Sequence, residues 1–214
     1  RMMLEKKPWL KFYDPGVPET IKYPQIPLQQ LLHVAAAGMP HKASTSFFGT
    51  ELTFRQIRAQ MLRMANALIK LGVKKGDRVA LALPNCPQYV IAYYGVLSAG
   101  AIVVNVNPMY TFDELKFMME NAGVETLITF DGAMKVMRPL AAELKLKNVI
   151  ITAVTDYIDG MPASTHQSLK LEASWHHYSE LLAACPAESV PRIEFQSTDI
   201  ALIQFTGGTT GLPK

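Results

Sequence analysis

The chain has 214 residues, of which 49% are hydrophobic and 18% are charged, and its 21 basic and 18 acidic residues give a formal net charge of +3. This composition excludes a disordered chain and is sufficient for a buried core in one large domain or two small ones. The basic residues are spread along the sequence without an Arg/Lys cluster, which argues against nucleic acid as a partner.

The first 27 residues are rich in proline and are predicted to form an extended leader that lies on a domain rather than folding alone. Arg1 precedes two methionines and is not expected to be a natural start. Pro8, Asp14 and Pro15 come before any apolar run, so no signal peptide is expected. The lysines at positions 6, 7 and 11 are typical of a solvated edge, and a lipid-binding patch is the alternative. Residues 28–214 are expected to form one α/β subdomain.

A helix is predicted at 28–38 and a hairpin at 45–54. Thr53 and Gln56 then have the spacing of a capping box, in which the side chain of each residue bonds the backbone N–H of the other. They start a long helix with apolar residues at helical spacing, and Gly72 supplies its C-terminal stop.

The stretch from 79 to 112 contains no Asp, Glu, Lys or Arg and could be taken for a transmembrane segment. Its prolines and asparagines leave an apolar core at 89–104, which is shorter than the roughly 20 residues that a spanning helix needs. Gly95 and Gly100 interrupt this core further. We therefore predict a strand at 78–83, a buried helix at 87–99 and a buried strand at 101–106.

The rest of the chain continues the alternation of strands and helices. Thr111 and Glu114 form a second capping-box pattern, and Gly123 ends the helix that they start. Further strands are expected at 124–130, 149–153 and 199–205, with helices at 133–144 and 175–183 and a surface loop at 155–172. This alternation predicts an α/β fold with a mainly parallel sheet and helices on both faces.

Cys86 and Cys185 are the only cysteines. A secreted disulfide framework would need more of them, so two reduced thiols in a cytoplasmic protein are expected. The sequence contains no CxxC and no HExxH motif. His176 and His177 are expected to lie on a helix, where adjacent side chains point in different directions, so they make a poor metal-binding pair.

The segment 206–214 reads Thr-Gly-Gly-Thr-Thr-Gly-Leu-Pro-Lys and directly follows the strand predicted at 199–205. Glycines let backbone N–H groups converge on one point, and such a concavity binds phosphate oxygens. Threonine hydroxyls and a lysine ammonium add donors and charge. The candidate phosphate-binding residues are Thr206, Gly207, Gly208, Thr209, Thr210, Gly211 and Lys214. This is not a Walker A loop, because Pro213 precedes the lysine. On composition alone, an ordinary Gly/Thr turn stays an equal alternative.

This segment resembles the signature loop of the adenylate-forming enzymes, which include acyl-CoA synthetases, aryl-CoA ligases, luciferases and peptide-synthetase adenylation domains. Gly207 replaces the usual Ser, a variant familiar in long-chain fatty-acyl ligases, so no role of that side chain is carried over. Leu-Thr-Phe-Arg-Gln-Ile at 52–57 resembles the first core motif of the family, and residues 97–108 resemble the second. The leader, with Lys-Pro-Trp at 7–9, is similar to that of bacterial and archaeal long-chain fatty-acid–CoA ligases.

The resemblance implies the N-terminal part of the large domain of an ATP-dependent long-chain fatty-acid–CoA ligase, ending just after its phosphate-binding loop. In that reaction a fatty acid attacks the α-phosphate of ATP, and coenzyme A converts the acyl-adenylate to acyl-CoA and AMP. The resemblance assigns the β- and γ-phosphates to residues 206–214, with Thr206 as a Mg²⁺ ligand. It also implies that the catalytic lysine and most of the acyl pocket lie downstream. No catalytic residue is expected within this chain, which alone is expected to be inactive.

Fatty acid, ATP and coenzyme A are the partners that the resemblance implies, together with Mg²⁺. It also allows a homodimer and peripheral contact with the inner face of the cell membrane. Two alternatives stay open. The first is another adenylate-forming ligase, acting on an aryl acid or an amino acid. The second is a non-catalytic binding module that kept half of the fold, which a stop codon directly after Lys214 would favour.

Overall fold

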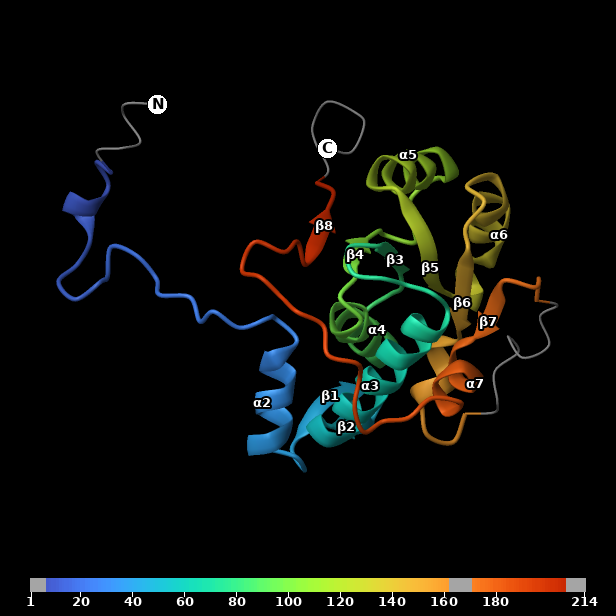
Figure 1. Ribbon diagram of the computed structural model, residues 1–214, viewed down its shortest axis with the longest axis horizontal. Helices are drawn as coiled ribbons and strands as arrows, with labels where there is room; N and C mark the ends of the chain where they lie inside the picture. The colour runs from blue at the N-terminus through green and yellow to red at the C-terminus, as the bar shows by residue number, and fades with distance from the viewer. Residues whose placement is uncertain (1–6, 162–170, 207–214) are drawn as a thin grey trace.

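The computed structural model describes residues 7–161 and 171–206 and has a six-stranded sheet at its centre (Figure 1). The strand order is β7-β6-β5-β3-β4-β8, and every neighbouring pair is parallel. The predicted α/β class with a mainly parallel sheet is confirmed. The strands are β3 (Arg78–Ala82), β4 (Ile102–Asn105), β5 (Val124–Phe130), β6 (Asn148–Thr152), β7 (Trp175–His177) and β8 (Leu202–Gln204).

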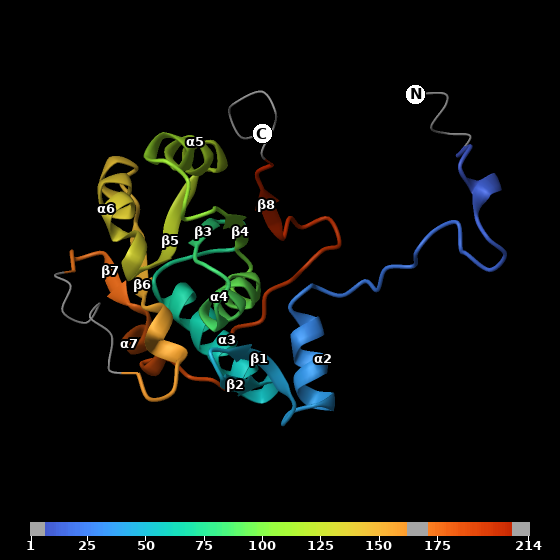
Figure 2. The same cartoon turned by 180° about the vertical axis from the view of Figure 1, so that it is seen from behind.

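Helices cover both faces of the sheet, as predicted (Figures 1 and 2). One face carries α2 (Gln30–Gly38), α3 (Phe54–Lys70), α4 (Pro87–Ser98) and α7 (Tyr178–Ala183), and the other carries α5 (Phe112–Ala122) and α6 (Met134–Glu143). In β3, Val79 and Leu81 pack into the first layer, whereas Ala80 and Ala82 pack into the second. A strand that is covered on both faces has no need to alternate polar and apolar residues.

Both capping boxes form as expected. At the start of α3, the backbone N–H of Gln56 donates to Thr53 Oγ1 at 3.3 Å, and the backbone N–H of Thr53 donates to Gln56 Oε1 at 2.8 Å. Thr111 and Glu114 exchange the same pair of bonds at the start of α5. Gly123 ends α5 with a φ of 65°, a left-handed conformation that glycine adopts at low cost.

The hairpin predicted at 45–54 is present as β1 (Ala43–Phe47) and β2 (Thr50–Thr53), which pair antiparallel. The stretch without charged residues forms a buried helix and a buried strand, α4 and β4, as predicted. Within residues 7–161 and 171–206, no helix has both the length and the apolar character that crossing a membrane requires.

The helix predicted at 175–183 is wrong in its first turn, since residues 175–177 form β7 and the helix begins only at Tyr178. β7 pairs in parallel with β6, and Trp175 is buried with the Arg138 guanidinium 4.5 Å from its ring centre. Sheet pairing and burial of the indole favour the extended conformation here. His176 and His177 therefore lie on a strand, where successive side chains point to opposite faces.

The buried strand predicted at 199–205 is shorter and more exposed than expected. Only Leu202–Gln204 are extended, and Leu202 is 37% exposed. β8 lies at the edge of the sheet and has β4 as its only neighbour among the described strands. An edge strand leaves one of its long sides uncovered, which accounts for the difference.

The surface loop predicted at 155–172 is wrong at its start, because Val154–Tyr157 form a partly buried 3₁₀ turn. Tyr157 packs against the layer that contains α3 and α4, and burial raises the pKa of its phenol. The Asp156 carboxylate accepts bonds from the backbone N–H of Ala153 at 2.9 Å and the Thr152 hydroxyl at 3.0 Å. Residues 162–170 lie outside the described part of the chain.

The described part of the leader does not lie on the domain, contrary to the prediction. Residues 8–26 are exposed except for Leu10, and they run away from the sheet (Figures 1 and 2). Proline lacks a backbone N–H, so this proline-rich segment is poorly suited to pair with a sheet edge. The division of the chain into a leader and one subdomain stays a prediction.

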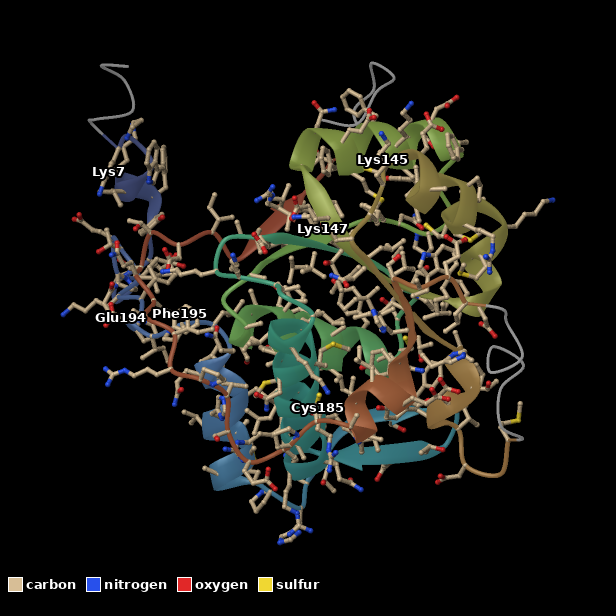
Figure 3. All side chains as sticks on the ribbon, turned by 45° about the vertical axis from the view of Figure 1, so that its right-hand side comes forward. Lys7, Lys145, Lys147, Cys185, Glu194 and Phe195 are labelled. Carbon is tan, nitrogen blue, oxygen red and sulfur yellow. The ribbon has the colours of Figure 1, made fainter. Side chains whose placement is uncertain are left out.

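The segment between α7 and β8 returns along α3, which holds it by side-chain bonds. Arg63 donates to the carbonyl of Cys185 at 2.8 Å, and Asn66 donates to the carbonyl of Ser189 at 2.7 Å. Figure 3 shows Cys185 beside α3 and Glu194 and Phe195 further along this segment. Lys75 donates to the carbonyl of Glu194 at 2.7 Å and forms an ion pair with Asp199. These contacts fix the path of the chain up to the edge strand.

Candidate functional site

The carboxyl edge of the sheet is where the chain changes direction across the fold. The connection from β3 to β4 runs through α4 on one face, whereas the connection from β4 to β5 runs through α5 on the other. β5 then lies on the opposite side of β3 from β4 (Figure 1). The loops that follow β3 and β4 therefore diverge and leave a crevice. Open α/β sheets bind their ligands at such switch points.

A pocket of about 470 Å³ occupies this edge. It is built from the ends of β3, β4, β5 and β8 with one residue each from α4 and α5. Its lining residues are Leu83, Pro84, Asn85, Tyr89, Asn105, Val106, Asn107, Pro108, Met109, Tyr110, Met118, Phe130, Gln204 and Phe205. None of them carries a formal charge at neutral pH. The pocket therefore suits an uncharged or apolar part of a ligand, which its amide groups can orient.

One hydrogen bond and one buried phenol characterise the lining of the pocket. The side-chain oxygen of Asn107 accepts the backbone N–H of Met109 at 2.9 Å, which closes the turn after β4. Burial of the ring raises the pKa of Tyr89 above its ordinary value, and the neighbouring Tyr93 raises it further by a smaller amount. The phenol of Tyr89 therefore stays protonated at neutral pH and remains able to donate a hydrogen bond.

The end of β8 is tied to β4 by a pair of side-chain amides. Asn105 and Gln204 are register partners on adjacent strands, and Asn105 Nδ2 donates to Gln204 Oε1 at 2.8 Å. Gln204 Nε2 in turn donates to the carbonyl oxygen of Phe205 at 3.0 Å. Thr206, the first residue of the glycine-rich segment, comes next and is exposed.

Of the candidate phosphate-binding residues, the structure describes Thr206 alone, which follows β8 at the carboxyl edge. Gly207, Gly208, Thr209, Thr210, Gly211 and Lys214 lie outside the described residues. Sequence reasoning missed the pocket residues beside Thr206. Asn85 and Asn107 each stand next to a proline just after a predicted strand, a turn signal that could have marked the loops at this edge.

No group of three or more His, Cys, Asp or Glu side chains that could hold a metal ion occurs in the two described ranges. A magnesium ion at this edge would therefore need most of its oxygen ligands from elsewhere. Mg²⁺ in nucleotide sites commonly takes only one or two protein oxygens, with substrate phosphates and water as the rest. The Thr206 hydroxyl is one hard oxygen donor of the required kind.

Comparison with known proteins identifies the family to which this fold belongs. The family model described as AMP-binding enzyme matches residues 32–214, which is most of the chain. The chain belongs to this family. The long-chain-fatty-acid–CoA ligase of Bacillus subtilis (strain 168) is 39% identical over 227 residues, which cover 99% of this chain and 40% of that protein. This AMP-binding family member thus spans about two-fifths of the length of the curated relatives it matches.

Solved structures of the family share its fold. A long-chain-fatty-acid-CoA ligase from Archaeoglobus fulgidus aligns with a TM-score of 0.74 at 23% identity, covering 94% of this chain and 38% of that structure. An anthranilate CoA ligase in complex with anthranoyl-AMP aligns with a TM-score of 0.76 at 19% identity, covering 89% of this chain and 34% of that one. The sheet and its flanking helices therefore match the N-terminal part of adenylate-forming enzymes.

Proposed function

We propose that the whole protein is an ATP-dependent long-chain fatty-acid–CoA ligase and that residues 206–214 hold the phosphates of ATP. The main observation in support of the proposal is the position of Thr206. This residue follows β8 at the carboxyl edge of the sheet, beside a pocket whose lining carries no formal charge. Family membership and the identity to a relative named as such a ligase support the substrate class.

The reaction has two steps. The fatty-acid carboxylate attacks the α-phosphorus of ATP, which forms acyl-adenylate and releases pyrophosphate. The thiol of coenzyme A then attacks the acyl carbon, which forms acyl-CoA, releases AMP and loses the thiol proton to solvent. Such chemistry depends on positioning and charge neutralisation rather than on a protein nucleophile.

The loop residues have separate roles in this proposal. Backbone N–H groups of Gly207, Gly208 and Gly211 bind the β- and γ-phosphate oxygens, assisted by the Thr209 and Thr210 hydroxyls. The Lys214 ammonium neutralises phosphate charge. Thr206 contributes one oxygen to Mg²⁺, which supplies further neutralisation of the triphosphate when it is bound.

The pocket beside the loop has a complementary role. Because its lining carries no formal charge, it suits an uncharged portion of the acid or of coenzyme A better than the triphosphate. The second candidate function is activation of an aryl acid. It is favoured by the aromatic lining residues Tyr89, Tyr110, Phe130 and Phe205, which suit a planar ring.

Acid-dependent exchange of labelled pyrophosphate into ATP tests the proposal on the full-length protein. Palmitate is expected to support exchange much faster than benzoate or 4-coumarate. A preference for the aromatic acids would favour the second candidate function. Absence of exchange with every acid would contradict the proposed adenylation, and a full-length gene that stops directly after Lys214 would favour a binding module.

A further inference from the structure

Few backbone contacts hold the strand that leads into the glycine-rich segment. Three residue pairs join β8 to β4, from Val103↔Leu202 to Asn105↔Gln204. Both Leu202 and Gln204 are exposed, so side-chain burial does little to fix them. The last pair lies at the carboxyl edge, two residues before Thr206. A shift of this pair would move the start of the loop with it.

The Gln204 amide is fixed from two sides. Its oxygen accepts from Asn105 Nδ2 at 2.8 Å, and its nitrogen donates to the Phe205 carbonyl at 3.0 Å. A flipped amide would set its NH₂ group against the Asn105 NH₂ group and its oxygen against a carbonyl oxygen, which loses both bonds. The amide pair therefore specifies one orientation and links β4 to the peptide that immediately precedes Thr206.

We infer that Asn105 and Gln204 are positioning residues that set the entry of the phosphate-binding loop and thereby its affinity for ATP. The inference rests on the proposed function and extends it to two residues outside the loop. Neither residue needs to touch the nucleotide. Their effect is geometric, because displacing a binding group by about 1 Å is sufficient to weaken strongly its contribution to binding and catalysis.

The pair is suited to local positioning rather than to global stability. Gln204 is exposed and Asn105 is half-buried, and water can replace each partner when the other is removed. The net contribution of such a hydrogen bond to folding is small. Removing it should therefore change nucleotide binding more than the melting temperature, which separates a positioning role from a purely structural one.

The test uses the full-length enzyme and the variants Asn105→Ala, Gln204→Ala and the double variant. The measurements are the dissociation constant for Mg·ATP and, in pyrophosphate exchange, KM for ATP and kcat. Each single variant is expected to raise KM for ATP and the dissociation constant roughly fivefold, the effect of one ordinary hydrogen bond. The double variant is expected to raise KM for ATP and the dissociation constant no further than either single variant does, because the two residues act as one unit.

The matched control is Asn148→Ala. Asn148 Nδ2 donates to Thr126 Oγ1 at 3.3 Å, and these residues are register partners on the neighbouring strands β6 and β5. This bond is of the same cross-strand kind but lies at the opposite, amino edge of the sheet. The control should leave KM for ATP unchanged.

The outcomes separate the two proposals. If wild-type enzyme binds ATP and Asn105→Ala binds it equally well, the positioning role is wrong while the proposed function stands. A lower kcat with unchanged KM, or an Asn148→Ala variant with the same rise in KM, would also overturn the positioning role. If the wild-type enzyme binds no ATP, the proposed function is wrong and the positioning role falls with it.

Discussion

Gly95 of α4 lies directly against Met64 of α3, and a Cβ atom at position 95 would be 2.5 Å from Cγ and 2.7 Å from Cβ of Met64. The carbonyl oxygen of Met61 would be 3.3 Å away. The two helices therefore approach as closely as they do because residue 95 has no side chain. Since α4 connects β3 to β4, this contact fixes the connecting helix against α3 in the layer on that face of the sheet.

Gly95→Ala is expected to lower the free energy of unfolding by about 1–3 kcal/mol, the usual cost of overpacking a core. Gly38→Ala is the control, because no atom lies within 4 Å of the added methyl group and Gly38 is the last residue of α2. It should be neutral or slightly stabilising. Urea unfolding of both variants measures the difference, and equal midpoints would show that Met64 moves aside freely.

The capping box of α3 gives a second prediction. Thr53→Ala removes the acceptor for the Gln56 N–H and should destabilise the protein by about 1 kcal/mol. Thr53→Ser keeps an oxygen at the same position and should recover most of that loss. Thermal or urea unfolding distinguishes them. If serine and alanine are equally destabilising, the methyl group of Thr53 matters and the cap does not.

The contact between α2 and α3 predicts a pH dependence. Arg58 Nε donates to His33 Nδ1 at 2.9 Å, and protonation of that nitrogen would abolish the acceptor. Burial, and then the Arg58 charge, lower the pKa of His33 in the folded state. The unfolded state therefore binds more protons in this range, so stability rises with pH. The stabilisation that neutral His33 contributes through this contact is present above a pH of about 6.5 and is lost as the pH falls below that value.

His33→Ala should flatten the dependence of unfolding free energy on pH between about 5 and 7. His41→Ala, at an exposed histidine, is the control and should keep the wild-type slope. His176, whose pKa burial also lowers, adds a residual slope of the same sign in both variants. If His33→Ala keeps the wild-type slope, titratable groups other than His33 cause the pH dependence of the unfolding free energy.

The chain of 214 residues is expected to form no acyl-CoA by itself. It contains the glycine-rich segment, but the family resemblance implies that the catalytic lysine and most of the acyl pocket lie downstream of Lys214. The assay combines ATP, Mg²⁺, palmitate and coenzyme A and follows AMP and pyrophosphate. Release of either product above a blank without enzyme would show that this part of the protein is sufficient for catalysis.

Elements with local signals could be predicted from the sequence, whereas those that depend on distant partners could not. The starts of α3 and α5 follow from Thr53 and Thr111, whose capping partners lie three residues away. β7 was missed because Trp175–His177 become extended only by pairing with β6, which lies more than twenty residues earlier in the chain. The exposure of β8 likewise depends on its place at the sheet edge.

The candidate site was predictable only in part for the same reason. Glycine spacing in the segment 206–214 suggested phosphate binding, and the family resemblance added the nucleotide. The pocket is assembled from the ends of four strands that are up to about 120 residues apart, so its composition appears only when the sheet is formed. The amide pair Asn105–Gln204 is a register contact of this kind and carries no sequence signature.

The most direct test of the central claim measures pyrophosphate exchange in the full-length enzyme, in the wild type and in Lys214→Ala and Thr206→Ala, at saturating palmitate. Loss of one preorganised donor is expected to cost about 2.7–4 kcal/mol of transition-state stabilisation, which is a rate loss of roughly 10²–10³. The melting temperature should barely change, because single loop side chains contribute little to folding. Equal exchange rates and equal ATP dependence in all three proteins would show that Lys214 and Thr206 belong to an ordinary turn and would contradict a phosphate-binding loop.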